Sequence, residues 1–252
     1  MRRQVQLFLC AVQFLTRLPV PKLGHFNPDW TTRSARYFPL VGQMVGALSA
    51  LILIGAAHLW NPWIAALLAI ATGVLITGGF HEDGLIDTAD GLGGGETSER
   101  RLEIMKDSRI GTYGALAIVL SLALKVAALA GMPAFKAAVV LVAAHGLARA
   151  AAVVAIRLTP YAVAGRAGKW KPVPRGVSTG EAALGVLLAV WPFIFLPPLV
   201  ALAGVVAGSV LAAAIVVQAR RLVGGHTGDV LGAVEQLFEV GFLLGAAAVL
   251  IR

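Results

Sequence analysis

The most constraining feature of the sequence is a series of apolar stretches, each long enough to form a helix across a lipid bilayer. A spanning helix needs about 20 mainly apolar residues. Stretches of this length lie at residues 38–60, 62–80, 112–132, 134–158, 182–219 and 230–251. The stretch 182–219 is long enough for two spans, and Pro197 and Pro198 divide it because proline interrupts a helix. The sequence therefore predicts an all-α, polytopic membrane helix bundle of about seven transmembrane helices, folded as one domain over residues 1–252.

Composition supports this class of protein and excludes others. Hydrophobic residues make up 58% of the chain and charged residues 13%, with a mean hydropathy of +0.81. These values exclude a soluble enzyme, a disordered protein and a disulfide-rich secreted module. The single cysteine, Cys10, cannot form an intrachain disulfide. Polar residues interrupt the apolar segment 4–20, which indicates an N-terminal amphipathic or re-entrant segment rather than a cleavable signal.

The basic residues predict how the chain is oriented in the membrane. Seven spans place residues 1–37, 81–111, 159–181 and 219–229 on one side. These segments and their edges carry 17 of the 21 Lys and Arg residues, while the opposite turns carry none. The positive-inside rule then puts the long loops in the cytoplasm and the C-terminus outside. The net charge of +8 is explained by membrane topology, so we expect no nucleic-acid partner.

An acidic segment follows the second apolar stretch and predicts a metal site. Asp83, Asp87 and Asp90 have the spacing i, i+4 and i+7, which places them on one face of a helix, and Glu82 is a further possible ligand. Carboxylates so arranged repel one another unless a divalent cation binds them. Oxygen ligands favour Mg²⁺, which commonly takes phosphate oxygens as its remaining ligands. The alternative is a solvated acidic helix end. For His81, a surface position is favoured over a role as fourth metal ligand.

Basic residues follow the acidic helix and predict binding of a polyanion such as a diphosphate. Lys106 and Arg109 lie where the chain returns to the membrane, and Arg101 lies in a short helix before them. The alternative is local salt bridging with the neighbouring acidic residues. A glycine-rich stretch, residues 91–95, connects the acidic segment to the basic one. Its backbone either approaches phosphate or acts as a hinge.

The last loop and the spans contain further polar residues. His226 and Asp229 lie in the loop before the final span, and Glu239 lies inside that span. We expect Glu239 to be either a buried partner of Arg149 or Lys125, or part of a second polar site. Pairs of glycines four residues apart, at 42/46, 204/208 and 241/245, indicate close helix packing.

Several of these segments resemble one known family. Residues 81–91, followed by 101–114, are similar to the signature of the cobalamin synthase family, also called adenosylcobinamide-GDP ribazoletransferases. The resemblance extends to residues 14–20, 36–42 and 225–233, and so covers nearly the whole chain. One departure is found after Pro160-Tyr161-Ala162, where the family has an arginine and this chain has Val163, with Arg166 as a possible substitute.

The resemblance implies a reaction and a location. Members of the family join α-ribazole, or its 5′-phosphate, to adenosylcobinamide-GDP and release GMP, with Mg²⁺ as the expected cofactor. They are multi-pass proteins of the bacterial inner membrane, so the resemblance implies a lipid bilayer as environment. Other membrane-associated enzymes of nucleotide-loop assembly and a second copy of the chain are possible partners. The site is expected to face the cytoplasm.

Roles for individual residues follow from the residue chemistry and this reaction. We expect the metal ligands to be Glu82, Asp83, Asp87 and Asp90. We expect the substrate-binding residues to be Arg101, Lys106, Arg109, Arg149 and His226. A carboxylate within reach of the attacking hydroxyl can serve as general base, and Asp229 is favoured over Asp90 because a carboxylate bound to metal is a weaker base.

Two other functions fit parts of the pattern. The spacing of Asp83, Asp87 and Asp90 is similar to that in the CDP-alcohol phosphotransferases, which also release a nucleoside monophosphate. Their motif has an Ala-Arg after its second Asp-Gly, and this chain lacks Ala-Arg at the corresponding position. Charged residues inside spans are also typical of a cation or small-molecule transporter. Against a transporter, the charges gather on one side and no internal repeat is found.

Overall fold

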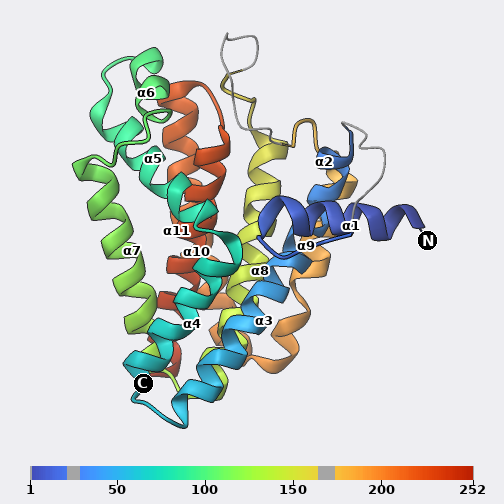
Figure 1. The fold of residues 1–252 in the computed structure, drawn as a ribbon, viewed down its shortest axis with the longest axis vertical. Coiled ribbons are helices and arrows are strands. Elements are labelled where there is room, and N and C mark those ends of the chain that lie inside the picture. The colour runs from blue at the N-terminus through green and yellow to red at the C-terminus, as the bar shows by residue number, and fades with distance from the viewer. Residues whose placement is uncertain (1, 22–28, 164–173, 252) are drawn as a thin grey trace.

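The protein is built from helices that run mostly along one direction (Figure 1). The computed structural model describes residues 2–21, 29–163 and 174–251. Within these residues there is no β-strand, and Tyr161 and His226 form an isolated β-bridge. The α-helices are α1 (Arg2–Leu15), α2 (Asp29–Ser34), α3 (Phe38–Ala57), α4 (Pro62–Thr77), α5 (Phe80–Gly94), α6 (Ser98–Ile104), α7 (Thr112–Gly131), α8 (Ala134–Leu158), α9 (Thr179–Ala189), α10 (Pro198–Val223) and α11 (Gly228–Leu250). Two short 3₁₀ helices are η1 (Ala35–Tyr37) and η2 (Trp191–Phe195).

The predicted polytopic helix bundle is confirmed, but with fewer full-length spans than the sequence predicts. Among the described residues, five helices are long and apolar enough to cross a membrane. They are α3 with the helices that precede it (Asp29–Ala57), α7, α8, α10 and α11. The bent pair α4 and α5 provides a sixth crossing if it is counted as one span. The predicted span before Pro197 is instead a short apolar segment, Thr179–Phe195, because α9 ends at Ala189 and continues as η2.

The glycine pairs lie where helices approach most closely, as predicted. Along the contact of α10 with α11, a Cβ added to Gly241 would lie 2.6 Å from the carbonyl oxygen of Ala207, and one on Gly208 would lie 2.9 Å from that of Phe238. On α3, a Cβ on Gly46 would lie 2.9 Å from the Cα of Val142 on α8. Small residues let the backbones meet where the bilayer supplies no hydrophobic driving force between helices.

Helix α1 crosses the bundle instead of running along it (Figure 1). Its apolar face, which includes Leu7, Ala11 and Leu15, is buried, and Gln4 and Gln13 are exposed on the other side. The helix therefore has one buried apolar face and one exposed polar face, as an amphipathic helix has. The predicted N-terminal amphipathic segment is therefore confirmed.

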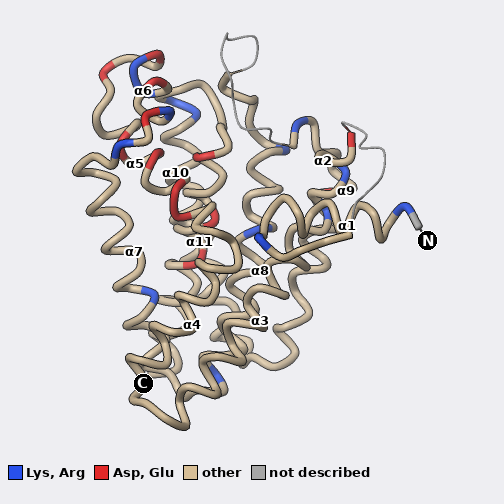
Figure 2. Tube along the Cα trace, viewed as in Figure 1, with Lys and Arg blue, Asp and Glu red and all other residues tan. Residues whose placement is uncertain are grey.

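Charged residues gather at the end of the bundle that carries α2, α5 and α6 (Figure 2). The opposite end, with the turns after α3 and α7, is almost free of charge in the described part of the chain. The acidic helix α5 and the basic helix α6 therefore lie at the same end of the molecule.

Candidate active site

The acidic helix α5 begins at a sharp break in the chain. Helices α4 and α5 meet at 90°, and the residues between them, Gly78 and Gly79, both have a φ of +70°. Glycine adopts this left-handed conformation without the steric cost that a side chain adds. The break starts α5 in a new direction, with Glu82 and Asp83 in its first turn. Acidic side chains are stabilised there by the helix dipole.

The three aspartates of α5 lie in different environments. Asp83 is exposed, Asp87 is half-buried and Asp90 is buried. The two oxygens of Asp90 accept 2.8 Å hydrogen bonds from the backbone N–H groups of Gly111 and Gly114 at the start of α7. These N–H groups have no partner within their own helix, so Asp90 is already engaged in holding α7. Its metal and catalytic roles stay predictions, and Asp83 and Asp87 are the more accessible pair.

No closed metal site is formed by the protein alone in the described residues. Nowhere in residues 2–21, 29–163 and 174–251 do three or more His, Cys, Asp or Glu side chains group closely enough to hold a metal ion. Asp83 and Asp87 could supply two carboxylate ligands from one helix face. Mg²⁺ is commonly held in this way, by one or two carboxylates, with water and substrate phosphates as its remaining ligands.

Glu82 connects the surface of α5 to the interior of the bundle. Nε2 of Gln236 on α11 donates a 2.9 Å hydrogen bond to Oε1 of Glu82, whereas Oε2 is buried without a hydrogen-bond partner. Gln236 accepts a 2.8 Å bond from Nζ of Lys125 on α7. An ammonium group can only donate, so the amide oxygen must face Lys125 and the amide nitrogen must face Glu82. Gln236 thereby fixes Glu82 relative to α7 and α11.

A cluster of ion pairs lies in the interior among α5, α7, α8 and α11. We call it the interior ion cluster; it consists of His81, Lys125, His145, Arg149, Glu235 and Glu239. Glu239 lies 2.6 Å from Nζ of Lys125 and 3.0 Å from Nδ1 of His145, and it also pairs with Arg149. Glu235 lies 3.2 Å from Nε of Arg149 and 2.8 Å from Nε2 of His81.

This cluster decides between the two interpretations of Glu239. It is a buried partner of both Lys125 and Arg149, and two cations meet two carboxylates. His81, for which the sequence favoured a surface role, is 2% exposed, so that expectation is wrong. Arg149 is also 2% exposed and is occupied by Glu235 and Glu239. Its role in substrate binding stays a prediction that this geometry does not favour.

The basic segment lies beside the acidic helix. Helix α6 packs on α5 at Gly91, where a Cβ would lie 2.9 Å from the carbonyl oxygen of Arg101. Lys106 and Arg109 are exposed, and Arg101 is half-buried. Arg109 pairs with Asp107 at 2.5 Å, and its hydrogen bonds lower the pKa of the Asp107 carboxyl to about 2. The predicted neighbourhood of acidic and basic residues is confirmed; phosphate binding by these residues stays a prediction.

The start of α11 lies against α5. The two helices cross at Gly84 and Gly232, where a Cβ on Gly84 would lie 2.7 Å from the carbonyl oxygen of Asp229 and 3.0 Å from the Cα of Gly232. Thr227 caps α11 by accepting a 3.2 Å hydrogen bond from the N–H of Val230. The expected general base Asp229 is therefore in the first turn of α11, next to the helix that carries Asp83 and Asp87.

His226 is held in place by the segment that follows α8. Its N–H donates to the carbonyl oxygen of Pro160 and its carbonyl accepts from the N–H of Ala162, both at 2.9 Å. Its Nδ1 lies 2.8 Å from the hydroxyl of Thr159. Burial lowers the pKa of His226 to about 4, so the imidazole is uncharged at neutral pH. With Arg175 it lines a pocket of about 620 Å³, and Arg166 lies outside the described residues.

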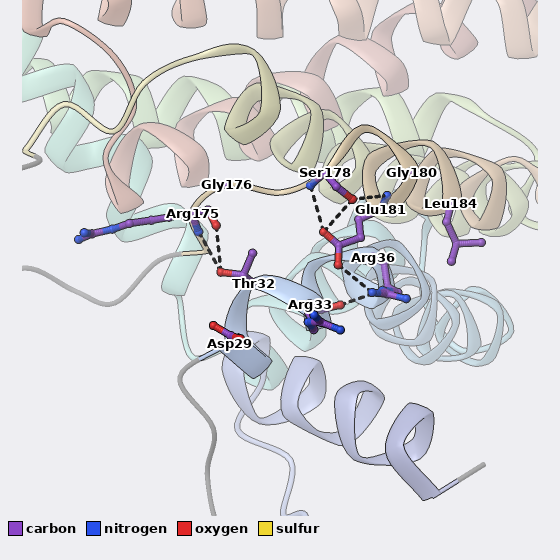
Figure 3. Close-up of a pocket in the computed structure, with 10 residues that line it drawn as sticks. All are labelled: Asp29, Thr32, Arg33, Arg36, Arg175, Gly176, Ser178, Gly180, Glu181 and Leu184. Atoms are coloured by element: carbon purple, nitrogen blue, oxygen red, sulfur yellow. Dashed lines mark hydrogen bonds and ion pairs between the residues drawn. The ribbon is translucent and has the colours of Figure 1, made fainter.

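A second pocket, of about 610 Å³, lies between α2 and α9 (Figure 3). Arg36 reaches across it to Glu181 at 2.7 Å, and the backbone of Arg175 exchanges hydrogen bonds with the hydroxyl of Thr32. The side chain of Arg175 points away from the other lining residues and stacks on the ring of Tyr161. The charges that Arg36 and Glu181 bring to this pocket are paired with each other.

A third pocket, of about 760 Å³, lies at the break between α4 and α5. It contains Glu82 and Asp83 from the acidic helix and Arg17 from the chain that follows α1. The sequence interpretation assigned no role to Arg17, although it belongs to the stretch 14–20 that carries the family resemblance. The sequence did contain a signal for Arg17, because a basic residue stands inside a stretch that resembles the family. That stretch is far in sequence from the acidic segment 81–91, so the two were not connected.

Comparison with known proteins identifies the family. Residues 7–247 match the family model described as cobalamin-5-phosphate synthase. The chain belongs to the cobalamin-5-phosphate synthase family. A protein of Leptothrix cholodnii is 46% identical, covering 96% of this chain and 95% of its own length; one of Shewanella pealeana is 40% identical, covering 95% and 93%. Both are named adenosylcobinamide-GDP ribazoletransferase. No solved structure matches the chain.

Family membership applies to the whole site. The matched residues begin within α1 and end within α11, so they include the acidic helix, the basic segment, the interior ion cluster and Asp229. The resemblance inferred from the motifs is confirmed.

Proposed function

We propose that the chain transfers the cobinamide phosphate of adenosylcobinamide-GDP to α-ribazole, or to α-ribazole 5′-phosphate, and releases GMP. The product is adenosylcobalamin or its 5′-phosphate. The near full-length identity to relatives named for this activity carries the proposal. The placement of acidic and basic residues at one end of the bundle supports it, because displacement at a diphosphate needs charge neutralisation. A CDP-alcohol phosphotransferase and a transporter are no longer needed to explain the pattern.

The transfer is a substitution at phosphorus. The ribazole hydroxyl oxygen forms a bond to the phosphorus nearer cobinamide, and the bond from that phosphorus to the bridging oxygen breaks. The departing oxygen leaves with GMP, and the hydroxyl proton passes to a carboxylate. We assign this base to Asp229, which lies beside α5 at the start of α11. Asp90 is a weaker choice because each of its oxygens already accepts an N–H.

The acidic residues of α5 are proposed to hold Mg²⁺. Asp83 and Asp87, one helical turn apart, supply accessible carboxylates, and Glu82 has a buried oxygen without a partner. The ion would neutralise charge on the diphosphate when bound. Lys106, Arg109 and Arg101 on the adjoining segment would hold phosphate oxygens, which requires Arg109 to exchange its bond with Asp107 for one with substrate.

The location and partners are also proposed. We place the protein in the bacterial inner membrane with the charged end facing the cytoplasm, where the nucleotide substrate is found. This follows from the distribution of Lys and Arg. Other membrane-associated enzymes of nucleotide-loop assembly are the expected neighbours.

GMP release from purified protein in liposomes tests the proposal. The assay contains Mg²⁺, adenosylcobinamide-GDP and either α-ribazole or its 5′-phosphate. Asp87→Ala is expected to lower the rate at least 100-fold, because each group aimed at developing charge contributes about 10²–10³. Glu103→Ala is the matched control, since it removes an exposed carboxylate whose ion pair, within the described part of the chain, is with exposed Arg100.

The controls determine how failure is interpreted. Glu103→Ala should keep the wild-type rate, and chelating Mg²⁺ should stop release. A well-folded wild type that releases no GMP with either acceptor would contradict the activity. Release of CMP from a CDP-activated lipid would then support the phosphotransferase alternative.

A further inference from the structure

The pocket at the break between α4 and α5 places opposite charges around one cavity. Glu82 and Asp83 lie on the side formed by α5, and Arg17 lies on the side formed by the chain after α1. Its volume of about 760 Å³ falls within the range of small-molecule sites. This is room for a diphosphate and the group attached to it, but the corrinoid ring must lie outside.

The backbone of Arg17 is fixed at the edge of this pocket. Its backbone N–H donates a 2.7 Å hydrogen bond to the carbonyl oxygen of Ile76, in the last turn of α4. Its side chain lies over Gly78, where a Cβ would be only 3.0 Å from Cγ of Arg17. The bond attaches the chain after α1 to the end of α4, and the missing side chain at Gly78 leaves space for the arginine.

The guanidinium of Arg17 is exposed, and no described residue forms a hydrogen bond or ion pair with its side chain. It is close to the acidic wall of the pocket yet has no carboxylate within ion-pair distance among residues 2–21, 29–163 and 174–251. A planar guanidinium binds phosphate through two parallel N–H bonds. A phosphate group with a cation on its far side would complement both walls.

We propose that Arg17 binds a phosphate of the nucleoside-diphosphate substrate, and that the pocket at the α4–α5 break forms part of the diphosphate site. This inference rests on the proposed function and adds a binding residue to it. It gives α1 a second role, because the amphipathic helix leads directly into a residue of the site. A phospholipid headgroup offers the same phosphate chemistry, so the test must separate the two sources.

Binding of GDP with Mg²⁺ to the full chain is the direct measurement. It is made by isothermal titration in a phospholipid-free maltoside detergent, which removes lipid phosphate. Arg17→Gln is expected to weaken GDP binding about 10- to 100-fold, the range for one hydrogen bond to a charged group. Arg17→Lys should recover only part of this loss, because lysine lacks the bidentate geometry. Arg3→Gln, which removes an exposed arginine from α1, is the matched control.

Steady-state kinetics add a second readout. Arg17→Gln should raise the KM for adenosylcobinamide-GDP and leave the KM for α-ribazole unchanged. A general structural defect would alter both, and would also lower the thermal unfolding temperature of the apo protein.

Three results would overturn the inference. Wild-type GDP affinity in Arg17→Gln, with GMP release still dependent on Asp87, would remove Arg17 from the site and leave the proposed function standing. Unchanged GDP affinity together with less co-purified phospholipid would assign Arg17 to a lipid headgroup. A wild type that neither binds GDP nor releases GMP would contradict the proposed function itself.

Discussion

At the scale of single residues, Glu239 joins two buried cations and a histidine of the interior ion cluster. It joins α11 to Lys125 of α7 and to His145 and Arg149 of α8. Charges in the interior are tolerated only when each has a partner of opposite sign. Because Gln236 and Glu235 on the same helix reach Glu82 and His81 of α5, the cluster also supports the acidic helix.

Removing Glu239 should therefore destabilise the protein strongly. Glu239→Ala removes the carboxylate that pairs with buried Lys125 and one of the two that pair with buried Arg149, and breaking a buried pair costs about 3–5 kcal/mol. Thermal unfolding in detergent measures the loss. Restoring the charge balance with Lys125→Met in the same chain should recover part of the stability, whereas equal stability of Glu239→Ala and wild type would contradict a structural role for the cluster.

The sequence predicted some of these residue environments and missed others. The sequence left two options for Glu239, a buried ion pair or a second polar site. A carboxylate inside a span needs a partner, but which residues it faces depends on how the helices pack. The engagement of Asp90 with Gly111 and Gly114 was not predictable, since helical periodicity placed it on the same face as Asp83 and Asp87. Which aspartate is covered depends on where α7 begins, and that is a tertiary contact.

At the scale of elements, the crossing of α5 with α11 determines how the acidic helix meets Asp229. The helices can approach only because Gly84 and Gly232 have no side chains at the contact. The same absence of side chains explains the contact between α10 and α11. In both places glycine sets the distance between backbones.

Adding one methyl group at Gly84 tests the importance of this distance. In Gly84→Ala the Cβ would meet the carbonyl oxygen of Asp229 at 2.7 Å, so the helices must separate. Overpacking of this kind costs about 1–3 kcal/mol, and we expect GMP release to fall at least 10-fold. Gly55→Ala on α3 is the matched control, because nothing lies within 4 Å of that position; it should be neutral or stabilising. Full activity in Gly84→Ala would show that the crossing distance does not matter.

Element boundaries were predictable where proline or composition marks them and less so elsewhere. The turns before Pro62 and Pro198 and the break between α7 and α8 agree with the sequence. Hydropathy alone cannot show that α4 stops at Thr77, because the residues after it are still apolar; the positive φ of Gly78 and Gly79 decides it. The conversion of α9 into η2 before Pro197 likewise depends on packing and not on composition.

At the scale of the whole molecule, the separation of charge along the bundle is the property that links fold to function. Acidic and basic residues of α5, α6 and the start of α11 share one end, which under the proposed function faces the compartment containing the nucleotide. The amphipathic α1 crosses the bundle, and the chain after it is bonded to the end of α4 near the break between α4 and α5. The proposed orientation, which rests on the positive-inside rule, puts the charged end in the cytoplasm.

Cysteine labelling can test this orientation because the chain has a single native cysteine. In a Cys10→Ala background, Glu96→Cys introduces a thiol between α5 and α6, and Leu59→Cys introduces one in the turn after α3; both positions are exposed. A membrane-impermeant maleimide should label Glu96→Cys in inverted inner-membrane vesicles and Leu59→Cys in right-side-out spheroplasts. Labelling in the opposite pattern would place the charged end outside the cytoplasm. Labelling of both thiols from the same side would contradict a bundle that separates the two ends across the membrane.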